Sequence, residues 1–228
     1  MIYGKMLAEL IGTFTLVFVG MLAIANGADL LGVAFAHGLA IAVMATALGT
    51  VSGGQFNPAV SLGLSLIGKQ KWGDTLAFAA SQLLGGALGA FAVLGLKGHA
   101  ALAQAGFGQP NPGQGVSAMT ALGMETVLTF FLVLVILKVA VRQGHAMAGL
   151  IVGLTIVMDI LAGGPISGAA MNPARVFGPA LVSGDWTFQW VYWVGPLLGA
   201  ALAAATARTL WRLPTQPVAP APEGQQAV

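Results

Sequence analysis

The sequence predicts an all-α membrane protein with six transmembrane helices and two re-entrant half-helices, built as an inverted repeat. Composition sets the membrane class, because 57% of the residues are hydrophobic and 7% are charged, whereas soluble domains carry about 25% charged residues. The repeat is visible in two copies of Asn-Pro-Ala, which begin at Asn57 and Asn172, 115 positions apart. A Ser-Gly pair begins five residues before each copy. The two copies therefore mark equivalent points of an internal duplication.

Six apolar stretches are long enough to cross roughly 30 Å of hydrocarbon. They cover residues 6–25, 32–50, 73–96, 118–140, 147–163 and 188–211. The first stretch follows Lys5 and also resembles a secretory signal. Glu9 is poorly placed in a signal, and it recurs in the second half as Glu125. We therefore expect the first stretch to remain as a permanent span.

The duplication divides the chain into two units and a tail. We expect the first inverted repeat at residues 1–115 and the second at residues 116–211, each with three spans and one half-helix. Residues 212–228 are rich in Pro, Ala and Gln, a composition typical of a disordered segment. We expect them to form a cytoplasmic tail.

Basic residues are distributed unevenly between the connecting segments. One side of the six-span arrangement carries Lys5, Lys69, Lys71, Lys138, Arg142, Arg208 and Arg212. The opposite loops offer Lys97. Cytoplasmic loops carry the excess of Lys and Arg in multi-pass proteins. We therefore expect both termini in the cytoplasm, with the protein in the cell (inner) membrane.

A shorter apolar piece follows each Asn-Pro-Ala, at residues 58–67 and 173–182. Ten residues at about 1.5 Å each reach about 15 Å, which is half of the hydrocarbon thickness. In each piece Pro occupies the first helical position, and the Asn directly before it is expected to be the N-cap. The Gly-rich approaches at 52–54 and 163–168 are expected to be non-helical. Irregular backbone at membrane depth is tolerated where it lines a water-filled cavity, so a cavity is expected.

The two half-helices are expected to meet near the middle of the membrane. Three spans separate the motifs, so the half-helices enter from opposite faces. Their N-termini each carry roughly half a positive charge, which repels cations. A water that accepts hydrogen bonds from both Asn amides cannot also accept from a neighbouring water, so a proton wire is broken. The expected gate comprises Asn57, Pro58, Ala59, Asn172, Pro173 and Ala174.

On these motifs the chain resembles the major intrinsic protein family, the aquaporins and aquaglyceroporins, over about residues 5–211. The resemblance also rests on the run Ser52-Gly53-Gly54-Gln55-Phe56, on Arg175 directly after the second motif, and on Glu9 and Glu125. It implies the aquaporin fold and a homotetramer with one pore per subunit. It further implies a selectivity filter, which is most similar to that of plant vacuolar (tonoplast intrinsic) aquaporins and consists of His37, Ile160, Ala169 and Arg175.

The filter departs from the strict water-channel pattern, which has Phe on the second span and His on the fifth. Here His37 occupies the first of these positions and Ile160 the second. The imidazole of His37 keeps one polar side of the pore, and the flexible aliphatic chain of Ile160 means that one rigid ring is lost. The expected permeants are water with ammonia, urea or hydrogen peroxide beside it. A glycerol facilitator is the alternative, although Val176 and Ala180 replace the acidic and basic residues usual in glycerol channels. The pair Tyr192-Trp193 is typical of water channels.

Several polar residues allow more than one interpretation. We expect Glu9 and Glu125 to accept hydrogen bonds from backbone N–H groups of the re-entrant loops, with proton relay as the alternative. His37 could instead be a structural histidine satisfied by a backbone carbonyl. His145 is expected to be solvated, with gating by protonation as the alternative. The role of Asp159 stays open.

Other function classes fit the sequence less well. An ion-coupled secondary transporter also uses inverted repeats and broken helices, and Glu9, Glu125 and Asp159 could couple ions in one. An enzyme is not expected, because seven acids and three distant histidines do not assemble a catalytic constellation. No metal site and no cofactor are expected. The net charge of +2 with scattered basic residues argues against nucleic acid as a partner. The expected partners are water, small neutral solutes and the lipid bilayer.

Overall fold

The computed structural model describes residues 2–211, and this part of the chain is helical with loops between the helices. The tail expected at 212–228 lies outside the described residues. The elements are α1 Ile2–Ala25, α2 Leu30–Ser52, α3 Pro58–Leu66, α4 Trp72–Lys97, α5 His99–Gln104, η1 Gly106–Gly108, α6 Ala118–Ile136, the π-helix η2 Leu137–Arg142, α7 Ala148–Ser167, α8 Pro173–Ser183 and α9 Val191–Trp211. The all-α membrane class expected from the sequence is confirmed.

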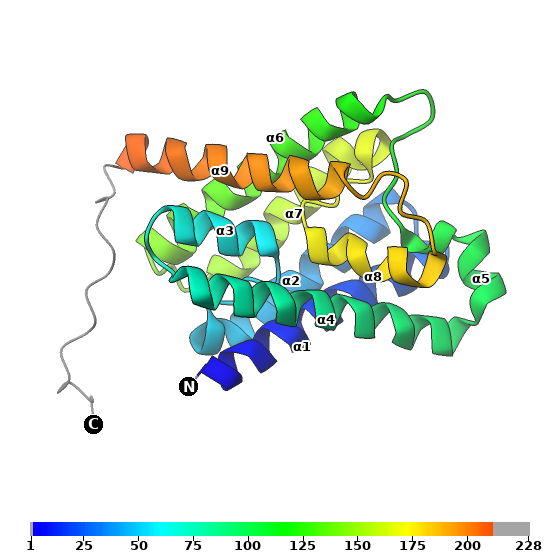
Figure 1. Cartoon of the computed structure of the whole chain (residues 1–228), viewed down its shortest axis with the longest axis horizontal. Helices are drawn as coiled ribbons and strands as arrows, with labels where there is room; N and C mark the ends of the chain where they lie inside the picture. Colours follow the sequence, from blue (N-terminus) through cyan, green and yellow to red (C-terminus); the bar gives the residue numbers. More distant parts are fainter. Residues whose placement is uncertain (1, 212–228) are drawn as a thin grey trace.

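Five helical segments are long and apolar enough to cross a membrane: α1, α2, α4, α6 with η2, and α7. The sixth expected span is α9, which has 21 residues. Tyr192, Trp193 and Arg208 lower its hydropathy, so length rather than composition identifies it as a span. It lies along α6 (Figure 1). The start of α1 and the end of α9 lie at the same end of the molecule (Figure 1), as an even number of crossings requires.

The packing of the helices follows the repeat. In the first half α1 packs against α4, in the second half α6 packs against α9, and α2 packs against α7 across the boundary between the halves. Glycines allow the close approach: a Cβ on Gly38 would meet the carbonyl of Gly153, and a Cβ on Gly153 would meet the carbonyl of Gly38. Small residues at helix contacts are the usual means of association in lipid.

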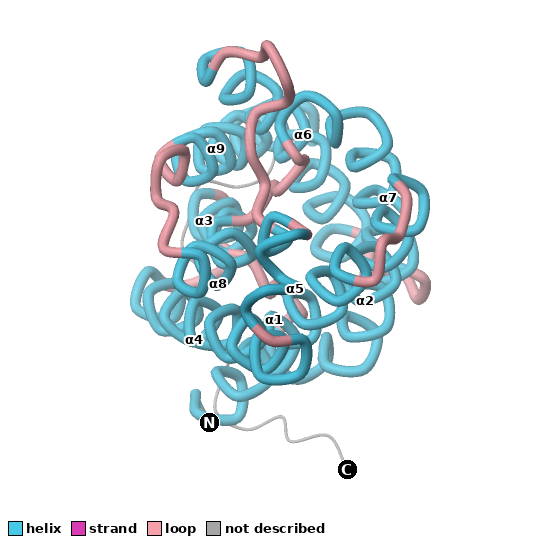
Figure 2. The backbone as a smooth tube through the Cα atoms, turned by 90° about the vertical axis from the view of Figure 1, so that its right-hand side faces the viewer, coloured by secondary structure: helices cyan, strands magenta, loops and turns pink. Residues whose placement is uncertain are grey.

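The half-helices α3 and α8 fill the remaining side of the helix ring. They lie between α4 and α9 (Figure 2) and contact both of them. Figure 1 shows them roughly end to end, with their N-terminal ends facing each other. The expected bounds 58–67 and 173–182 are close to the observed Pro58–Leu66 and Pro173–Ser183. The facing tips bring each asparagine to the loop that precedes the other, because Asn57 bonds to Met171 and Asn172 bonds to Phe56.

One expectation about the Gly-rich approaches is wrong. Gly163, Gly164 and Pro165 lie inside α7, which continues to Ser167. The two glycines serve helix packing instead, because a Cβ on Gly163 would collide with Leu128 and one on Gly164 would collide with Leu30. The helix ends at Gly168, whose φ of 80° is left-handed, a common way for glycine to end a helix.

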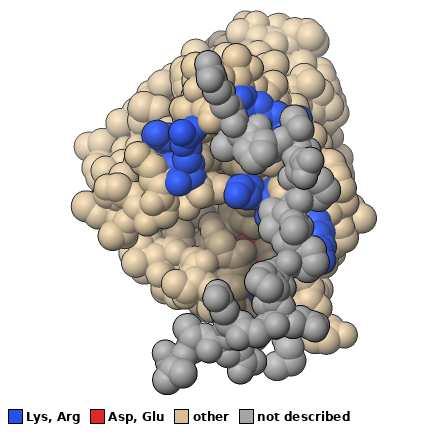
Figure 3. Space-filling model, turned by 90° about the vertical axis from the view of Figure 1, so that its left-hand side faces the viewer, with Lys and Arg blue, Asp and Glu red and all other residues tan. Residues whose placement is uncertain are grey.

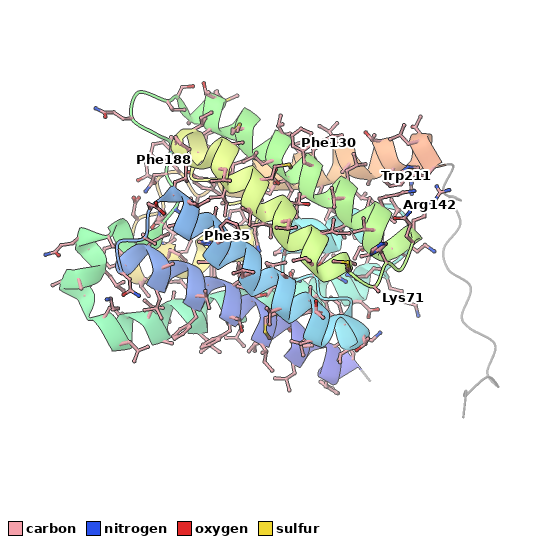
Figure 4. All side chains as sticks on the ribbon, turned by 180° about the vertical axis from the view of Figure 1, so that it is seen from behind. Phe35, Lys71, Phe130, Arg142, Phe188 and Trp211 are labelled. Carbon is pink, nitrogen blue, oxygen red and sulfur yellow. The ribbon has the colours of Figure 1, made fainter. Side chains whose placement is uncertain are left out.

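The Gly-rich segment at 52–54 is also partly helical. Ser52 is the last residue of α2, and this helix ends, as α7 does, at a glycine with left-handed backbone, Gly53, whose φ is 96°. The irregular loops are therefore shorter than expected and run from Gly53 to Asn57 and from Gly168 to Asn172. The short helices α5 and η1 and the π-helix η2 are not predicted by the apolar pattern of the sequence. The π-helix η2 interrupts the sixth turn of the span that begins with α6, near the end that carries Lys71 and Arg142 (Figure 4).

Candidate functional site

The centre of the candidate site is the point where the tips of α3 and α8 meet. Asn57 and Asn172 have extended backbone, with φ of −158° and −156°. The Oδ1 of Asn57 accepts from the N–H of Ala59 at 2.9 Å, and the Oδ1 of Asn172 accepts from the N–H of Ala174 at 2.9 Å. Pro58 and Pro173 occupy the first helical positions. Both asparagines are therefore N-caps, as the sequence predicts.

The two asparagines also bind the opposite loop. The Nδ2 of Asn57 donates to the carbonyl of Met171 at 2.8 Å, and the Nδ2 of Asn172 donates to the carbonyl of Phe56 at 2.9 Å. These reciprocal bonds hold the two tips together. Each amide nitrogen has two hydrogens, so each asparagine keeps one N–H that these bonds do not use. Both residues line a cavity.

Phe56 and Met171 adopt strained backbone, with φ of 50° and 54°, a region that bulky residues rarely occupy. Hydrogen bonds hold each residue on both sides. The N–H of Phe56 donates to Oε2 of Glu9 at 2.6 Å, and the N–H of Met171 donates to Oε2 of Glu125 at 2.7 Å. Their carbonyls accept from the opposite asparagines, as described above. The left-handed turn is what aims each N–H and each carbonyl at these partners.

The two buried glutamates support the re-entrant loops. Glu9 accepts from Ser52 Oγ at 2.6 Å and from the N–H of Gln55 at 3.0 Å, in addition to Phe56. Gln82 Nε2 adds a fourth bond at 2.7 Å. Glu125 accepts from Ser167 Oγ at 2.7 Å and from the N–H of Ala170 at 2.9 Å, in addition to Met171. Their oxygens are thus occupied by fixed donors.

The four expected filter residues line one end of the same cavity: His37 from α2, Ile160 from α7, Ala169 from the second re-entrant loop and Arg175 from α8. The His37 Nδ1 lies 2.8 Å from the carbonyl of Val33 and therefore donates to it. The Nε2 is then free to accept from Arg175 Nη2 at 3.2 Å. His37 thus satisfies a backbone carbonyl and also contacts Arg175. The Nη1 of Arg175 is buried and has no hydrogen-bond partner within residues 2–211.

The cavity has a volume of about 1330 Å³ and connects these four residues with one end of the molecule. It passes Asn172 and Asn57 and opens among Lys5, Lys69, Lys71 and Arg208, which we call the basic mouth. Figure 3 shows Lys and Arg side chains around a hollow at this end. Asp74 also lines the mouth. The cavity therefore joins a cationic entrance, the paired asparagines and a buried arginine.

Three further polar residues differ in their relation to the cavity: Asp159 lies outside its lining, His145 lies at the basic mouth, and Tyr192 supports the second re-entrant loop. Asp159 is 1% exposed and does not line the cavity, and its Oδ2 has no partner within the described chain. His145 lines the mouth, where its Nδ1 accepts from the N–H of Met147 at 3.1 Å. Tyr192 donates to the carbonyl of Ser167 at 2.7 Å. Residues 2–211 contain no group of three or more His, Cys, Asp or Glu that could hold a metal ion.

Known proteins resemble the chain over most of its length. The pattern of the major intrinsic protein family matches residues 1–206. Aquaporin TIP4-4 of Zea mays is 45% identical over 211 residues, which cover 86% of this chain and 82% of that protein. Aquaporin-8 of Mus musculus is 39% identical over 212 residues, which cover 90% of this chain and 80% of that protein.

The fold is also found in a solved structure. The aquaglyceroporin from Plasmodium falciparum superimposes with a TM-score of 0.84 at 26% sequence identity, covering 93% of this chain and 98% of that chain. The inverted-repeat architecture, the paired half-helices and the sequence matches agree. The chain is a multi-pass membrane protein that belongs to the major intrinsic protein family of channels.

Proposed function

We propose that the protein is a passive channel for water that also admits ammonia, urea or hydrogen peroxide and excludes ions and protons. The observation that carries this proposal is the pair of reciprocal bonds by which Asn57 and Asn172, at the tips of two facing half-helices, each hold the opposite loop, inside a cavity that reaches Arg175. The paired tips supply donors and partial positive charge at one point of the path. They supply no acceptor side chain that could pass a proton onward.

Proton exclusion follows from the direction of the hydrogen bonds. Each asparagine has one N–H that its loop bond does not use, and both residues line the cavity. A permeating water that accepts both N–H groups has its own hydrogens directed away from the junction. It then cannot accept from the next water, so protons cannot hop along the file. Water itself still moves.

The filter adds a second barrier against cations. Arg175 presents a buried guanidinium with an unpartnered Nη1, and His37 accepts from its Nη2. We assign Arg175 as the main donor to the permeating molecule and His37 as a polar wall. Ile160 and Ala169 then form an aliphatic wall, which leaves more space than two aromatic rings would. Small neutral molecules with hydrogen-bonding groups suit such an aperture.

Glycerol is the second candidate permeant. The matching structure from Plasmodium falciparum is described as an aquaglyceroporin, which favours a polyol. The relatives from Zea mays and Mus musculus are named aquaporins and are more similar in sequence, at 45% and 39% identity. Val176 and Ala180 on α8 also lack the charged side chains associated with glycerol channels. We therefore place water first.

We further propose that the protein forms a homotetramer with one pore per subunit and lies in the cell membrane with both termini in the cytoplasm. The basic residues around the mouth support this orientation (Figure 3), because Lys and Arg accumulate on the cytoplasmic side.

We divide the chain into repeats at 1–115 and 116–211. The buried glutamates are bonded to fixed loop donors, which speaks against an ion-coupled transporter.

Stopped-flow light scattering on proteoliposomes tests this function. The protein should raise the permeability to water strongly and to glycerol weakly, and it should also raise the permeability to urea and ammonia. Imposed proton or sodium gradients should leave these rates unchanged, since the flux is passive. Flux that depends on such a gradient would instead indicate a coupled transporter, and glycerol flux comparable to water flux would favour the second candidate.

A further inference from the structure

A chain of uncharged, hydrogen-bonded side chains runs from the first re-entrant loop, next to Asn57, to the start of α4, next to Lys71 of the basic mouth. Ser61 Oγ donates to Gln55 Oε1 at 2.6 Å, and Gln55 Nε2 donates to Gln70 Oε1 at 2.6 Å. Gln70 Nε2 then donates to Thr75 Oγ1 at 2.9 Å. The hydroxyl of Thr75 is also bonded to that of Ser65. These bonds connect the first re-entrant loop with the loop between α3 and α4.

Gln55 is held by this chain and is also one of the residues that line the cavity. Gln55, Ser65 and Gln70 line the cavity, and Gln55 is 7% exposed. Its Oε1 accepts one bond from Ser61 and its Nε2 donates one bond to Gln70. An amide oxygen can accept two bonds and an amide nitrogen can donate two. Gln55 therefore retains one acceptor position and one donor position.

The side chains of this arrangement are not repeated at the equivalent positions of the second half. The offset of 115 positions that relates the motifs places Ala170, Val176 and Asp185 where Gln55, Ser61 and Gln70 stand. None of those three has a side-chain amide. The second half instead contributes Arg175, on the other side of the asparagines. The polar groups next to the asparagines therefore differ on the two sides: the charged Arg175 on one side and the neutral Gln55 on the other, between Asn57 and the charged residues of the basic mouth.

We propose that Gln55 is a second contact site for permeating molecules, a neutral donor-acceptor pair for water and other small uncharged solutes between Asn57 and the basic mouth. Ser61 and Gln70 are positioning residues that hold its amide. A fixed amide replaces part of the solvation shell of a permeating molecule, and its orientation needs no further ordering when a molecule arrives. Val152 and Ile156 also line the cavity and offer no hydrogen bonds. This inference rests on the proposed channel function.

Four variants test the contact site by stopped-flow water permeability at several temperatures. Gln55→Leu removes the amide, and Gln70→Leu removes its positioning partner. Gln70→Glu keeps an acceptor for Gln55 Nε2 and serves as the conservative rescue. Gln143→Leu is the matched control, because Gln143 is exposed and lies outside the cavity lining. The temperature dependence of the flux, after the flux through protein-free vesicles is subtracted, is the decisive readout, since the Arrhenius slope of the channel itself does not depend on how many channels fold and insert.

We expect Gln55→Leu to lower the water permeability per channel about two- to tenfold, the rate equivalent of one lost hydrogen bond, and to steepen the Arrhenius slope. Gln70→Leu should steepen it less, Gln70→Glu should bring the slope back from the Gln70→Leu value toward that of the unmodified protein, and Gln143→Leu should match the unmodified protein. If Gln55→Leu does not fold, the contrast between Gln70→Leu and Gln70→Glu decides. Equal slopes in all variants of a conducting channel would overturn the contact site but leave the proposed function intact. An unmodified protein that conducts no water would overturn the function itself.

Discussion

At the scale of single residues, the site depends on side chains that complete the bonding of irregular backbone. Phe56 and Met171 remain in left-handed conformations because a glutamate accepts from each N–H and an asparagine donates to each carbonyl. Arg175 differs, because its Nη1 has no partner within residues 2–211. A buried unpartnered guanidinium N–H is costly unless something in the cavity accepts from it. A permeating molecule can supply that acceptor.

Arg175→Val tests the proposed filter. The substitution removes the guanidinium and shortens the side chain, so we expect glycerol permeability to rise relative to water and small cations to leak. Arg142→Val is the control, because Arg142 donates to the carbonyl of Trp211 and does not line the cavity. Vesicle assays with glycerol and a sodium-sensitive dye report both effects. Selectivity equal to that of the unmodified protein would remove Arg175 from the filter.

Glu125→Gln tests the support of the second re-entrant loop. The amide nitrogen cannot accept, so at least one loop donor loses its partner. We expect the protein to lose about 1–3 kcal/mol of stability, the cost of leaving a buried polar group unsatisfied. Thermal unfolding in detergent measures the change, with Asp185→Asn in an exposed loop as the control. If both variants unfold at the temperature of the unmodified protein, the loop does not depend on this carboxylate.

At the scale of elements, the position of α8 is set by backbone contact with α4. A Cβ on Gly86 would meet the carbonyl of Ala174, and a Cβ on Gly178 would meet the carbonyl of Gly86. The carbonyl of Ala174 belongs to the first turn of α8, directly before Arg175. Any displacement of α8 at this contact therefore moves Arg175, the proposed filter residue, and Asn172 together.

Gly86→Ala should push α4 away from α8. We expect a loss of about 1–3 kcal/mol in stability, typical of overpacking, together with reduced water permeability. Gly95→Ala on the same helix is the matched control, because a Cβ there meets nothing within 4 Å and alanine favours a helix over glycine. The same assays of unfolding and water flux apply. Equal behaviour of the two variants would show that the α4–α8 contact does not limit the position of α8.

The elements that the sequence predicts well are those fixed by local chemistry. Asn57-Pro58 and Asn172-Pro173 carry helix-start signatures in consecutive residues, so the half-helices are readable from the chain alone. The end of α7 is not, because Gly163 and Gly164 serve contacts with Leu128 and Leu30, which lie far away in sequence. Glycine there indicates close packing as readily as a helix break.

At the scale of the whole molecule, the important features need both halves at once. The bond from Asn57 to Met171 and the bond from Asn172 to Phe56 join residues more than a hundred positions apart. Sequence reasoning places the two tips near each other by parity but cannot supply this pairing, which depends on how deep each half-helix reaches. The connection of Gln55 with Gln70 likewise depends on how the loop after α3 folds back.

The absence of cysteine from the 228 residues gives a prediction for the whole channel. Thiol-directed mercurials should not reduce its water permeability. Ala169→Cys should make the channel sensitive, because position 169 lines the cavity beside Arg175. The measurement is water flux before and after mercurial treatment, and after reversal with a thiol reagent. Block of the unmodified protein, or a resistant and conducting Ala169→Cys variant, would contradict the position of residue 169 in the path.

The most direct test of the account measures water and protons in the same vesicles. Proteoliposomes that contain a trapped pH-sensitive dye are exposed to an osmotic step and, separately, to a pH step with a clamped membrane potential. The paired asparagine tips predict fast osmotic shrinkage while the internal pH changes no faster than in protein-free vesicles. Proton flux that rises in proportion to water flux, or shrinkage no faster than in empty vesicles, would contradict the claim that the two half-helix tips form a gate for neutral molecules.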